Sequence, residues 1–222
     1  RPGLRPEARR SADIAHELRT PLTIVQGQID SMRYGVISTD DEALSKLNQQ
    51  TELLSRLVKD LRTLSLADAQ QLTLERQAVD IVTLLPQVVE SFREEARERG
   101  VTLSVQGPDP GALFLNLDPE RMMQVLINLL SNALRHTPQG GRVGVALQYG
   151  PEEVVISVKD TGEGLSEEAL ENAFNRFYRA DSSRDRATGG TGLGLAISKT
   201  IVKLHGGSIT AANGKEGGAA FT

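Results

Sequence analysis

The chain has 222 residues, of which 39% are hydrophobic and 24% are charged, so it is long enough for one large or two small folded domains. Its formal net charge of -4 argues against a surface built to neutralise nucleic-acid or membrane phosphates. The absence of cysteine excludes a disulfide framework, a thiolate metal site and a cysteine nucleophile. The sequence shows no signal peptide and no apolar run near the roughly 20 residues that span a bilayer. From its first and last residues we expect a fragment of a longer protein.

The first part of the sequence predicts two long amphipathic helices. Apolar residues recur at spacings of three and four over residues 14–32, which places them in one stripe along a helix. A turn is expected over residues 35–41, and a second stripe follows over residues 44–64 at nearly heptad spacing. Because a two-helix hairpin has too little core to be stable alone, we expect a second copy to complete a four-helix bundle. The pattern therefore predicts a homodimer.

A polar, aperiodic stretch then separates this hairpin from a region of different character. We expect a helical hairpin domain over residues 1–67, a linker over residues 68–77 and a second domain over residues 78–222. Of the 21 glycines, 15 lie from Gly140 onward, which indicates many turns in the second domain. The pattern predicts an α+β sandwich. Its expected helices cover residues 81–99, 119–136 and 193–204, and its expected strands cover residues 101–106, 113–117, 142–149, 154–159, 208–211 and 219–221.

One histidine of the first helix stands out by its neighbours. His16 lies two residues before Leu18, so it is expected on the side of the helix opposite the apolar stripe, facing water. A solvated surface histidine is the simplest explanation. However, Glu17 follows at once and Pro21 interrupts the helical pattern one turn later, where proline removes a backbone hydrogen bond. A neutral ring nitrogen can act as a nucleophile, and an adjacent carboxylate can fix the tautomer.

The expected helix over residues 119–136 carries an unusual polar stripe. Asn128, Asn132 and Arg135 lie at i, i+4 and i+7, opposite an apolar face. Asparagine is a mediocre helix former, and two of them one turn apart could supply oxygen ligands for Mg²⁺. A polar stripe that merely faces solvent is the alternative.

Two glycine-rich segments complete the candidate site. Asp160 and the glycines at 162 and 164 end a strand, where a carboxylate and a close backbone can meet a ligand, although a plain turn has the same composition. Residues 189–195 open a helix with free backbone N–H groups that suit a phosphate. A dinucleotide-binding interpretation fails because no strand precedes this run, and the sequence contains no phosphate-binding loop of the Gly-x-x-x-x-Gly-Lys type.

Together these motifs resemble the catalytic core of a bacterial two-component sensor histidine kinase. Residues 11–22 (SADIAHELRTPL) are similar to the phosphoacceptor box, and residues 128–138 resemble the asparagine box. Residues 160–164 (DTGEG) resemble the first glycine box, residues 174–179 (FNRFYR) the phenylalanine box, and residues 190–195 the second glycine box. The resemblance implies a helical hairpin that forms a dimeric four-helix bundle, followed by an α+β sandwich ATP-binding domain of the gyrase and histidine-kinase type.

The resemblance also implies roles for individual residues. His16 would accept the γ-phosphoryl group of ATP and pass it to an aspartate of a response regulator, and Glu17 would polarise its imidazole. Thr20 matches the position that positions water in the family's phosphatase activity toward the same regulator. Asn132 would hold Mg²⁺ with Asn128 beside it. The implied nucleotide-binding set is Asn128, Asn132, Arg135, His136, Asp160, Gly162, Gly164, Arg179, Gly190, Thr191, Gly192, Leu193 and Gly194, with residues 180–191 as a lid; Leu113, Phe174 and Phe177 are expected to be core residues.

Two alternatives remain at this stage. A pseudokinase would bind nucleotide and signal by conformation only, and a gyrase-type clamp or a serine-directed anti-sigma kinase would share the ATP-binding domain. The intact His16 and Asn132 argue against the first, and the hairpin argues against the second. For the kinase, the resemblance implies a cytoplasmic fragment of a protein in the bacterial inner membrane, attached through segments outside this chain, with no nucleic-acid partner.

Overall fold

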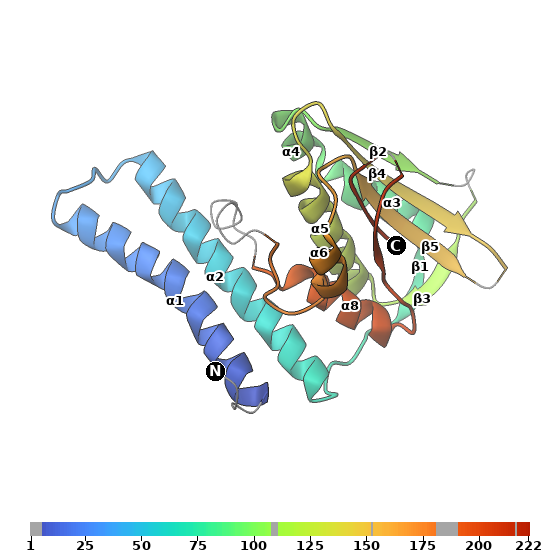
Figure 1. The fold of residues 1–222 in the computed structure, drawn as a ribbon, viewed down its shortest axis with the longest axis horizontal. Coiled ribbons are helices and arrows are strands. Elements are labelled where there is room, and N and C mark those ends of the chain that lie inside the picture. Colours follow the sequence, from blue (N-terminus) through green and yellow to red (C-terminus); the bar gives the residue numbers. More distant parts are fainter. Residues whose placement is uncertain (1–5, 108–110, 152, 181–190, 216) are drawn as a thin grey trace.

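The computed structural model describes residues 6–107, 111–151, 153–180, 191–215 and 217–222, with side chains from Ile14 onward except that of His16. It begins with two helices of 28 residues each, α1 (Pro6–Arg33) and α2 (Asp41–Asp68), which pack against each other as a hairpin (Figure 1). Asp40 caps α2 by accepting a hydrogen bond from the N–H of Ala43. The described helices include none that is long and apolar enough to cross a membrane.

The hairpin buries only part of its apolar stripe within one chain. Pro21 and Val25 of α1 are buried, whereas Leu22 and Ile29 of the same helix are 47% and 48% exposed. Leu44 of α2 is exposed to a similar extent. These exposed apolar side chains leave a face on which another helix pair could pack.

The remaining elements form an α+β domain of two layers, as the sequence predicts. Its elements are β1 (Gln77–Asp80), α3 (Ile81–Glu90), α4 (Arg93–Glu98), β2 (Thr102–Gln106), β3 (Phe114–Leu117), α5 (Pro119–His136), β4 (Arg142–Tyr149), β5 (Val154–Asp160), α6 (Glu167–Asn172), α8 (Gly194–Leu204), β6 (Ala211–Asn213) and β7 (Ala219–Phe221).

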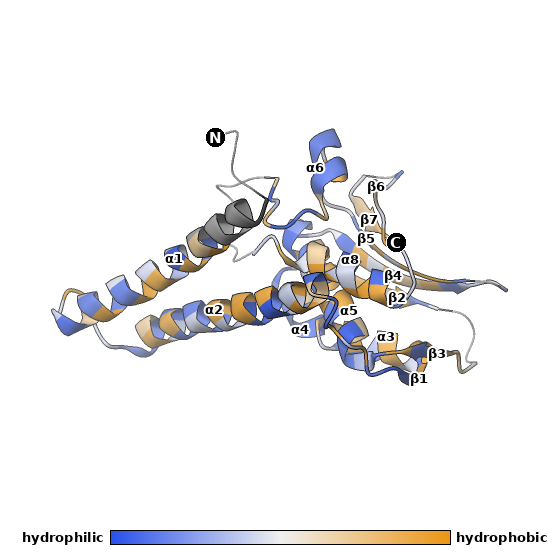
Figure 2. Ribbon diagram, turned by 90° about the horizontal axis from the view of Figure 1, so that it is seen from below, coloured by the Kyte–Doolittle hydropathy of each residue, from blue (hydrophilic) through white to orange (hydrophobic). Residues whose placement is uncertain are grey.

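One mixed sheet forms the first layer of this domain. Its strand order is β2-β4-β5-β7-β6, in which β2 runs parallel to β4 and the other neighbours are antiparallel. The strands β1 and β3 pair separately. The helices α3, α5 and α8 form the second layer on one face of the sheet (Figures 1 and 2). Val143, Val145 and Leu147 of β4 alternate with less buried neighbours, so the core lies between the two layers.

Two expectations about secondary structure are wrong. The single helix expected over residues 81–99 is two helices, α3 and α4, because the Ser91 hydroxyl bonds the Val88 carbonyl and Phe92 turns into the core. The strand expected over residues 208–211 lies instead at β6, where Ala211 pairs with Phe221 of β7. The expectations also omitted β1 and the short helix α6.

The hairpin meets the α+β domain through α2, which packs against α8 (Figure 1). Leu57 and Leu64 of α2 are each 2% exposed and belong to the same buried cluster as the core residues of the domain. Hydrophobic residues continue along α2 toward the domain (Figure 2). Burial of two leucines at this contact stabilises it by about 3–6 kcal/mol of transfer free energy.

Candidate functional site

A cavity of about 590 Å³ opens between α5, the loop after β5, the start of α8 and the strand β7. Side chains far apart in the sequence meet there, and α2 of the hairpin contributes to its wall. The predicted nucleotide-binding residues that line it are Asn128, Asn132, Arg135, His136, Asp160, Gly164, Arg179, Thr191, Gly192 and Gly194. The structure therefore brings the asparagine stripe and both glycine segments to one place.

Two of the predicted residues do not line the cavity, and a third is not described. Leu193 is fully buried in the hydrophobic core and does not line the cavity, because it precedes α8 with its side chain on the helix face that packs inward. Gly162 is needed for packing, since a Cβ there would lie 2.2 Å from the carbonyl oxygen of His136. Gly190 and most of the expected lid, residues 181–190, lie outside the described residues.

Asp160 is the best-positioned carboxylate of the site. It is 6% exposed, and its Oδ1 accepts hydrogen bonds from the N–H groups of Gly162 (2.8 Å) and Ala219 (3.1 Å). Both of these hydrogen bonds end on Oδ1, and Oδ2 accepts no hydrogen bond from the described residues. Asp160 borders the cavity. Two fixed backbone donors hold the carboxylate so that its second oxygen is available to an amino group of a ligand.

The two asparagines of α5 have different environments. The Asn128 side-chain nitrogen donates to the Gly194 carbonyl (3.0 Å) and to the Ser198 hydroxyl (3.4 Å), so it ties α5 to the start of α8. Asn132 is half-buried and borders the cavity. The described residues contain no group of three or more His, Asp or Glu side chains that could hold a metal alone. Asn132 can offer its amide oxygen to a cation held in the cavity together with a ligand.

A backbone hydrogen bond joins the phenylalanine box to the second glycine box. Phe177 has φ +61, which is unusual for a bulky residue, and its N–H donates to the Gly192 carbonyl at 2.8 Å. A Cβ on Gly192 would lie 2.9 Å from the Phe177 backbone, so only glycine fits this approach. Phe174 packs edge-on against Phe221, with ring centroids 6.3 Å apart. Phe174, Phe177 and Leu113 all pack against the core, as predicted.

Sequence reasoning missed the contribution of the last strand. Ala219 and Phe221 of β7 line the cavity, and the Ala219 N–H holds Asp160. Gly218, with φ +74, allows this contact, because a Cβ there would lie 1.9 Å from the Asp160 carbonyl oxygen. The signal in the sequence was the glycine pair just before the expected strand, which marks a close backbone approach.

Two further residues missed by sequence reasoning come from the hairpin. Arg56 and Asp60 lie one turn apart on α2 and both line the cavity. Burial raises the pKa of the Asp60 carboxyl to about 6, and the neighbouring Arg56 guanidinium partly opposes this rise. At neutral pH the ionised Asp60 carboxylate therefore lowers the stability of the folded chain.

We expect Asp60→Asn to stabilise the ligand-free protein at pH 8 by about 1–3 kcal/mol. The reason is that a neutral amide in the cavity wall avoids the burial of a charged carboxylate. In the unfolded chain the carboxyl ionises near its ordinary pKa, and in the folded chain only near 6. The wild type should thus lose stability as the pH rises through this window, and the advantage of the variant should vanish below about pH 4. Chemical denaturation at several pH values measures this difference, and a constant difference across the range would contradict it.

The three residues predicted to act on the phosphoryl group lie on α1. His16 is within the helix, and its side chain is outside the described part of the structure. Glu17 is half-buried and Thr20 is exposed one turn after His16. Pro21 is buried and lies inside the helix, which continues through it. The catalytic roles of these residues stay predictions.

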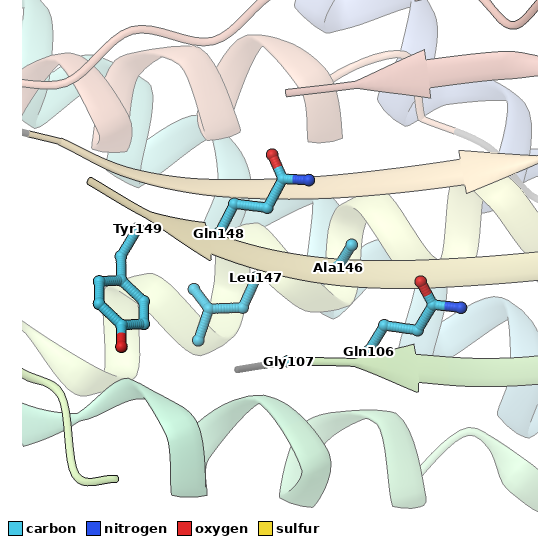
Figure 3. Close-up of a pocket in the computed structure, with 6 residues that line it drawn as sticks. All are labelled: Gln106, Gly107, Ala146, Leu147, Gln148 and Tyr149. Atoms are coloured by element: carbon cyan, nitrogen blue, oxygen red, sulfur yellow. The ribbon is translucent and has the colours of Figure 1, made fainter. Parts of the chain in front are cut away.

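A second pocket, of about 360 Å³, lies at the other end of the sheet between β2 and β4 (Figure 3). The amides of Gln106 and Gln148 and the ring of Tyr149 border it, together with Gly107, Ala146 and Leu147. None of these described lining residues is an Asp, Glu, His, Lys or Arg. The charged side chains that line a described pocket belong to the larger cavity.

Comparison with known proteins accounts for both parts of the chain. The family described as His Kinase A (phospho-acceptor) domain matches residues 8–70, and the family described as Histidine kinase-, DNA gyrase B-, and HSP90-like ATPase matches residues 117–222. The chain is 39% identical to the signal transduction histidine-protein kinase BaeS of Escherichia coli over 95% of its length, and 39% identical to the sensor histidine kinase WalK of Bacillus subtilis over 90%. It spans 45% and 33% of those two proteins, respectively.

Solved structures give the same result. The histidine kinase AdeS of Acinetobacter baumannii matches with a TM-score of 0.78 and 30% identity, covering 93% of this chain and 94% of that one. The histidine kinase ThkA, solved in complex with the response regulator protein TrrA, matches with a TM-score of 0.74 and 26% identity, covering 96% of this chain and 59% of that one. With both domains matched in order and the structure of a whole kinase core reproduced, the chain belongs to the bacterial sensor histidine kinases of two-component signalling.

Proposed function

We propose that this chain binds ATP in the cavity of the α+β domain, phosphorylates His16 and passes the phosphoryl group to an aspartate of a response regulator. The observation that carries the proposal is the convergence of Asp160, Asn132 and the second glycine box on one cavity, in a chain that also has the phosphoacceptor helix. Pairing with a response regulator is supported by the relative ThkA, whose solved complex contains one.

The cavity can accommodate the parts of ATP separately. The free oxygen of Asp160 suits the adenine amino group, and Arg135 and Arg179 suit the phosphates. Backbone N–H groups at the start of α8 add donors for phosphate oxygens. Asn132 offers an amide oxygen for Mg²⁺, which would neutralise phosphate charge when bound.

The chemistry proposed for the hairpin is nucleophilic. A ring nitrogen of neutral His16 forms a bond to the γ-phosphorus while the bond to the bridging oxygen of ADP breaks. Glu17 holds and then takes the proton on the other ring nitrogen, so that the imidazole does not accumulate positive charge. An aspartate carboxylate of the regulator next displaces the histidine and leaves the phosphoryl group as an acyl phosphate.

Dimerisation through the hairpin is part of this proposal. The exposed apolar residues Leu22, Ile29 and Leu44 would be buried by a second hairpin in a four-helix bundle. We place the domain pair in the cytoplasm, where ATP and the regulator are found, and propose that the full-length protein is attached to the inner membrane by segments outside this chain. Molar mass in solution tests the dimer, and its loss in Leu22→Glu tests the surface.

Incubation of the chain with γ-labelled ATP and Mg²⁺ tests the proposed function directly. Covalent label on the protein that moves to a receiver domain would support it. Tight nucleotide binding with no label on His16 would support the alternative, a nucleotide-binding module that signals by conformation only.

Thr20→Ala should separate the two activities proposed for α1. The Thr20 hydroxyl lies four residues after His16, so it is expected one turn away on the same face, where it could hold a water that attacks the regulator's aspartyl phosphate. Dephosphorylation of the regulator should fall by about tenfold or more, while labelling of His16 stays near normal.

A structural role for Thr20 predicts a different result. Its hydroxyl could instead bond a backbone carbonyl next to Pro21, as helical threonines often do. In that case both activities should change together with the melting temperature. Measuring the two rates and the melting temperature on one preparation distinguishes the roles, with Thr20→Ser as the control that keeps the hydroxyl.

A further inference from the structure

An ion pair joins the last turn of α2 to the phenylalanine box of the α+β domain. The Arg176 guanidinium donates from Nη1 to Asp68 Oδ2 at 2.8 Å and from Nη2 to Oδ1 at 2.6 Å. Pairs such as Lys46–Glu42 join neighbours on one helix, whereas these two residues are 108 positions apart in the sequence. The bidentate geometry fixes orientation as well as distance, so the pair restrains how the two domains dock.

Asp68 lies at an unfavourable position within α2 itself. A carboxylate in the last turn of a helix opposes the helix dipole, and α2 has no basic residue in that turn. A cation from outside the helix can offset this cost. Arg176 supplies such a cation, and the side chains of Asp68 and Arg176 are 42% and 28% exposed, respectively.

Arg176 is also directly connected to the nucleotide cavity. The next residue, Phe177, has the left-handed backbone conformation that donates its N–H to Gly192, and Gly192 borders the cavity. Movement of the Arg176 backbone would therefore reach the second glycine box through two residues. The ion pair thus links the hairpin, the phenylalanine box and the phosphate end of the site.

In this docked arrangement α2 walls the cavity. Arg56 and Asp60 of α2 line it, and Leu57 and Leu64 of the same helix belong to the buried core cluster. Among the α1 side chains that the structure describes, including Glu17 beside His16, none lines the cavity. Transfer needs the reacting atoms about 3–3.5 Å apart and in line, so the ATP-binding domain must leave this docked position on α2 before a bound nucleotide can reach a His16 of the dimer.

We propose that the Asp68–Arg176 ion pair is an interdomain latch that holds the ATP-binding domain on α2 and keeps it from His16 until the latch opens. The inference rests on the proposed function, since it concerns the approach of the nucleotide to the same histidine. The latch is weak enough to open, because a half-exposed pair shifts an equilibrium by about fivefold at most. Opening it leaves the hydrophobic contact of α2 with α8 as the remaining barrier.

The test compares single, double and charge-swapped variants of the chain. Asp68→Asn and Arg176→Gln should each raise the initial rate of His16 labelling by about threefold to fivefold, and the double neutral variant should raise it no further. The swap of Asp68→Arg with Arg176→Asp should return the rate toward wild type. Glu42→Gln removes a carboxylate from a pair at the far end of the same helix and should change nothing.

A distance measurement tests the latch without using activity. The chain has no cysteine, so spin labels can be attached at Lys59→Cys on α2 and Lys203→Cys on α8, both of which are exposed. With labelled chains diluted in unlabelled ones, Asp68→Asn should broaden the interdomain distance distribution and the charge swap should narrow it. An unchanged distribution would overturn the proposal, and so would a broadened one with a falling labelling rate. If the wild type does not label His16 at all, the proposed function fails while the distances still decide whether the pair holds the domains together.

Discussion

His16→Gln should abolish covalent labelling of the chain by γ-labelled ATP, lowering the rate by at least about a thousandfold. Glutamine keeps a polar side chain of similar reach, but its amide has no basic nitrogen to attack phosphorus. In the wild type the label should be lost in acid and kept in base, as expected for a phosphorus–nitrogen bond. Quantifying label after acid and base treatment of the two proteins gives the result.

Nucleotide binding supplies the control for this substitution. His16 lies on α1, whereas the cavity is built from the α+β domain and α2, so the affinity for ATP should stay within about twofold of wild type. Acid-stable label in the wild type would instead point to a serine or threonine. Retained label in His16→Gln would remove His16 from the mechanism.

Elements defined by local chemistry could be predicted almost to the residue. The helix α5 begins after Asp118, whose side chain caps it, and Pro119 suits the first helical turn. Its apolar side, including Leu126 and Leu130, is buried, while Asn132 on the opposite stripe faces the cavity. The bounds of a capped helix with a strong 3.6-residue period can therefore be predicted from its own residues.

Features that depend on distant partners could not be predicted in the same way. The short helix α6 has six residues, too few for a period, and β6 is three residues that pair only because β7 lies beside them. The hydrogen bond from the Ala219 N–H to Asp160 connects residues 59 positions apart, so no local sequence pattern predicts it. The motif predicts Leu193 at the site, yet its side chain is buried in the core while its neighbours Gly192 and Gly194 line the cavity.

The hairpin shows that the apolar periodicity of a helix does not predict which surface the helix packs against. The spacing predicts an apolar stripe on α1, but Leu22 and Ile29 of this stripe are exposed within one chain. On α2, Leu57 and Leu64 pack on the ATP-binding domain instead of only on α1. A helix with several apolar rows can serve two interfaces, and the sequence does not say which row serves which. For the same reason, the sequence does not indicate that Arg56 and Asp60 belong to the cavity wall.

Asn132→Ala should lower the rate of His16 phosphorylation by about a hundredfold, because it removes the amide oxygen proposed to hold Mg²⁺. The loss should appear as a higher Mg²⁺ requirement, so that raising Mg²⁺ partly restores the rate. Asn132→Asp keeps an oxygen at the same position and should retain more activity than the alanine variant. Rates measured over a Mg²⁺ titration at saturating ATP give the comparison.

Asn128→Ala is the matched variant that separates metal binding from packing. Its side chain joins α5 to α8 through Gly194 and Ser198, so its loss should lower the free energy of unfolding by about 1 kcal/mol or more, with the Mg²⁺ dependence less affected. Asn132→Ala should leave the melting temperature nearly unchanged, since half-buried Asn132 borders a cavity instead of bracing a helix. Wild-type rates in Asn132→Ala at every Mg²⁺ concentration would show that the stripe on α5 is only a polar face. A drop in rate that follows a drop in stability would assign Asn132 the bracing role of Asn128.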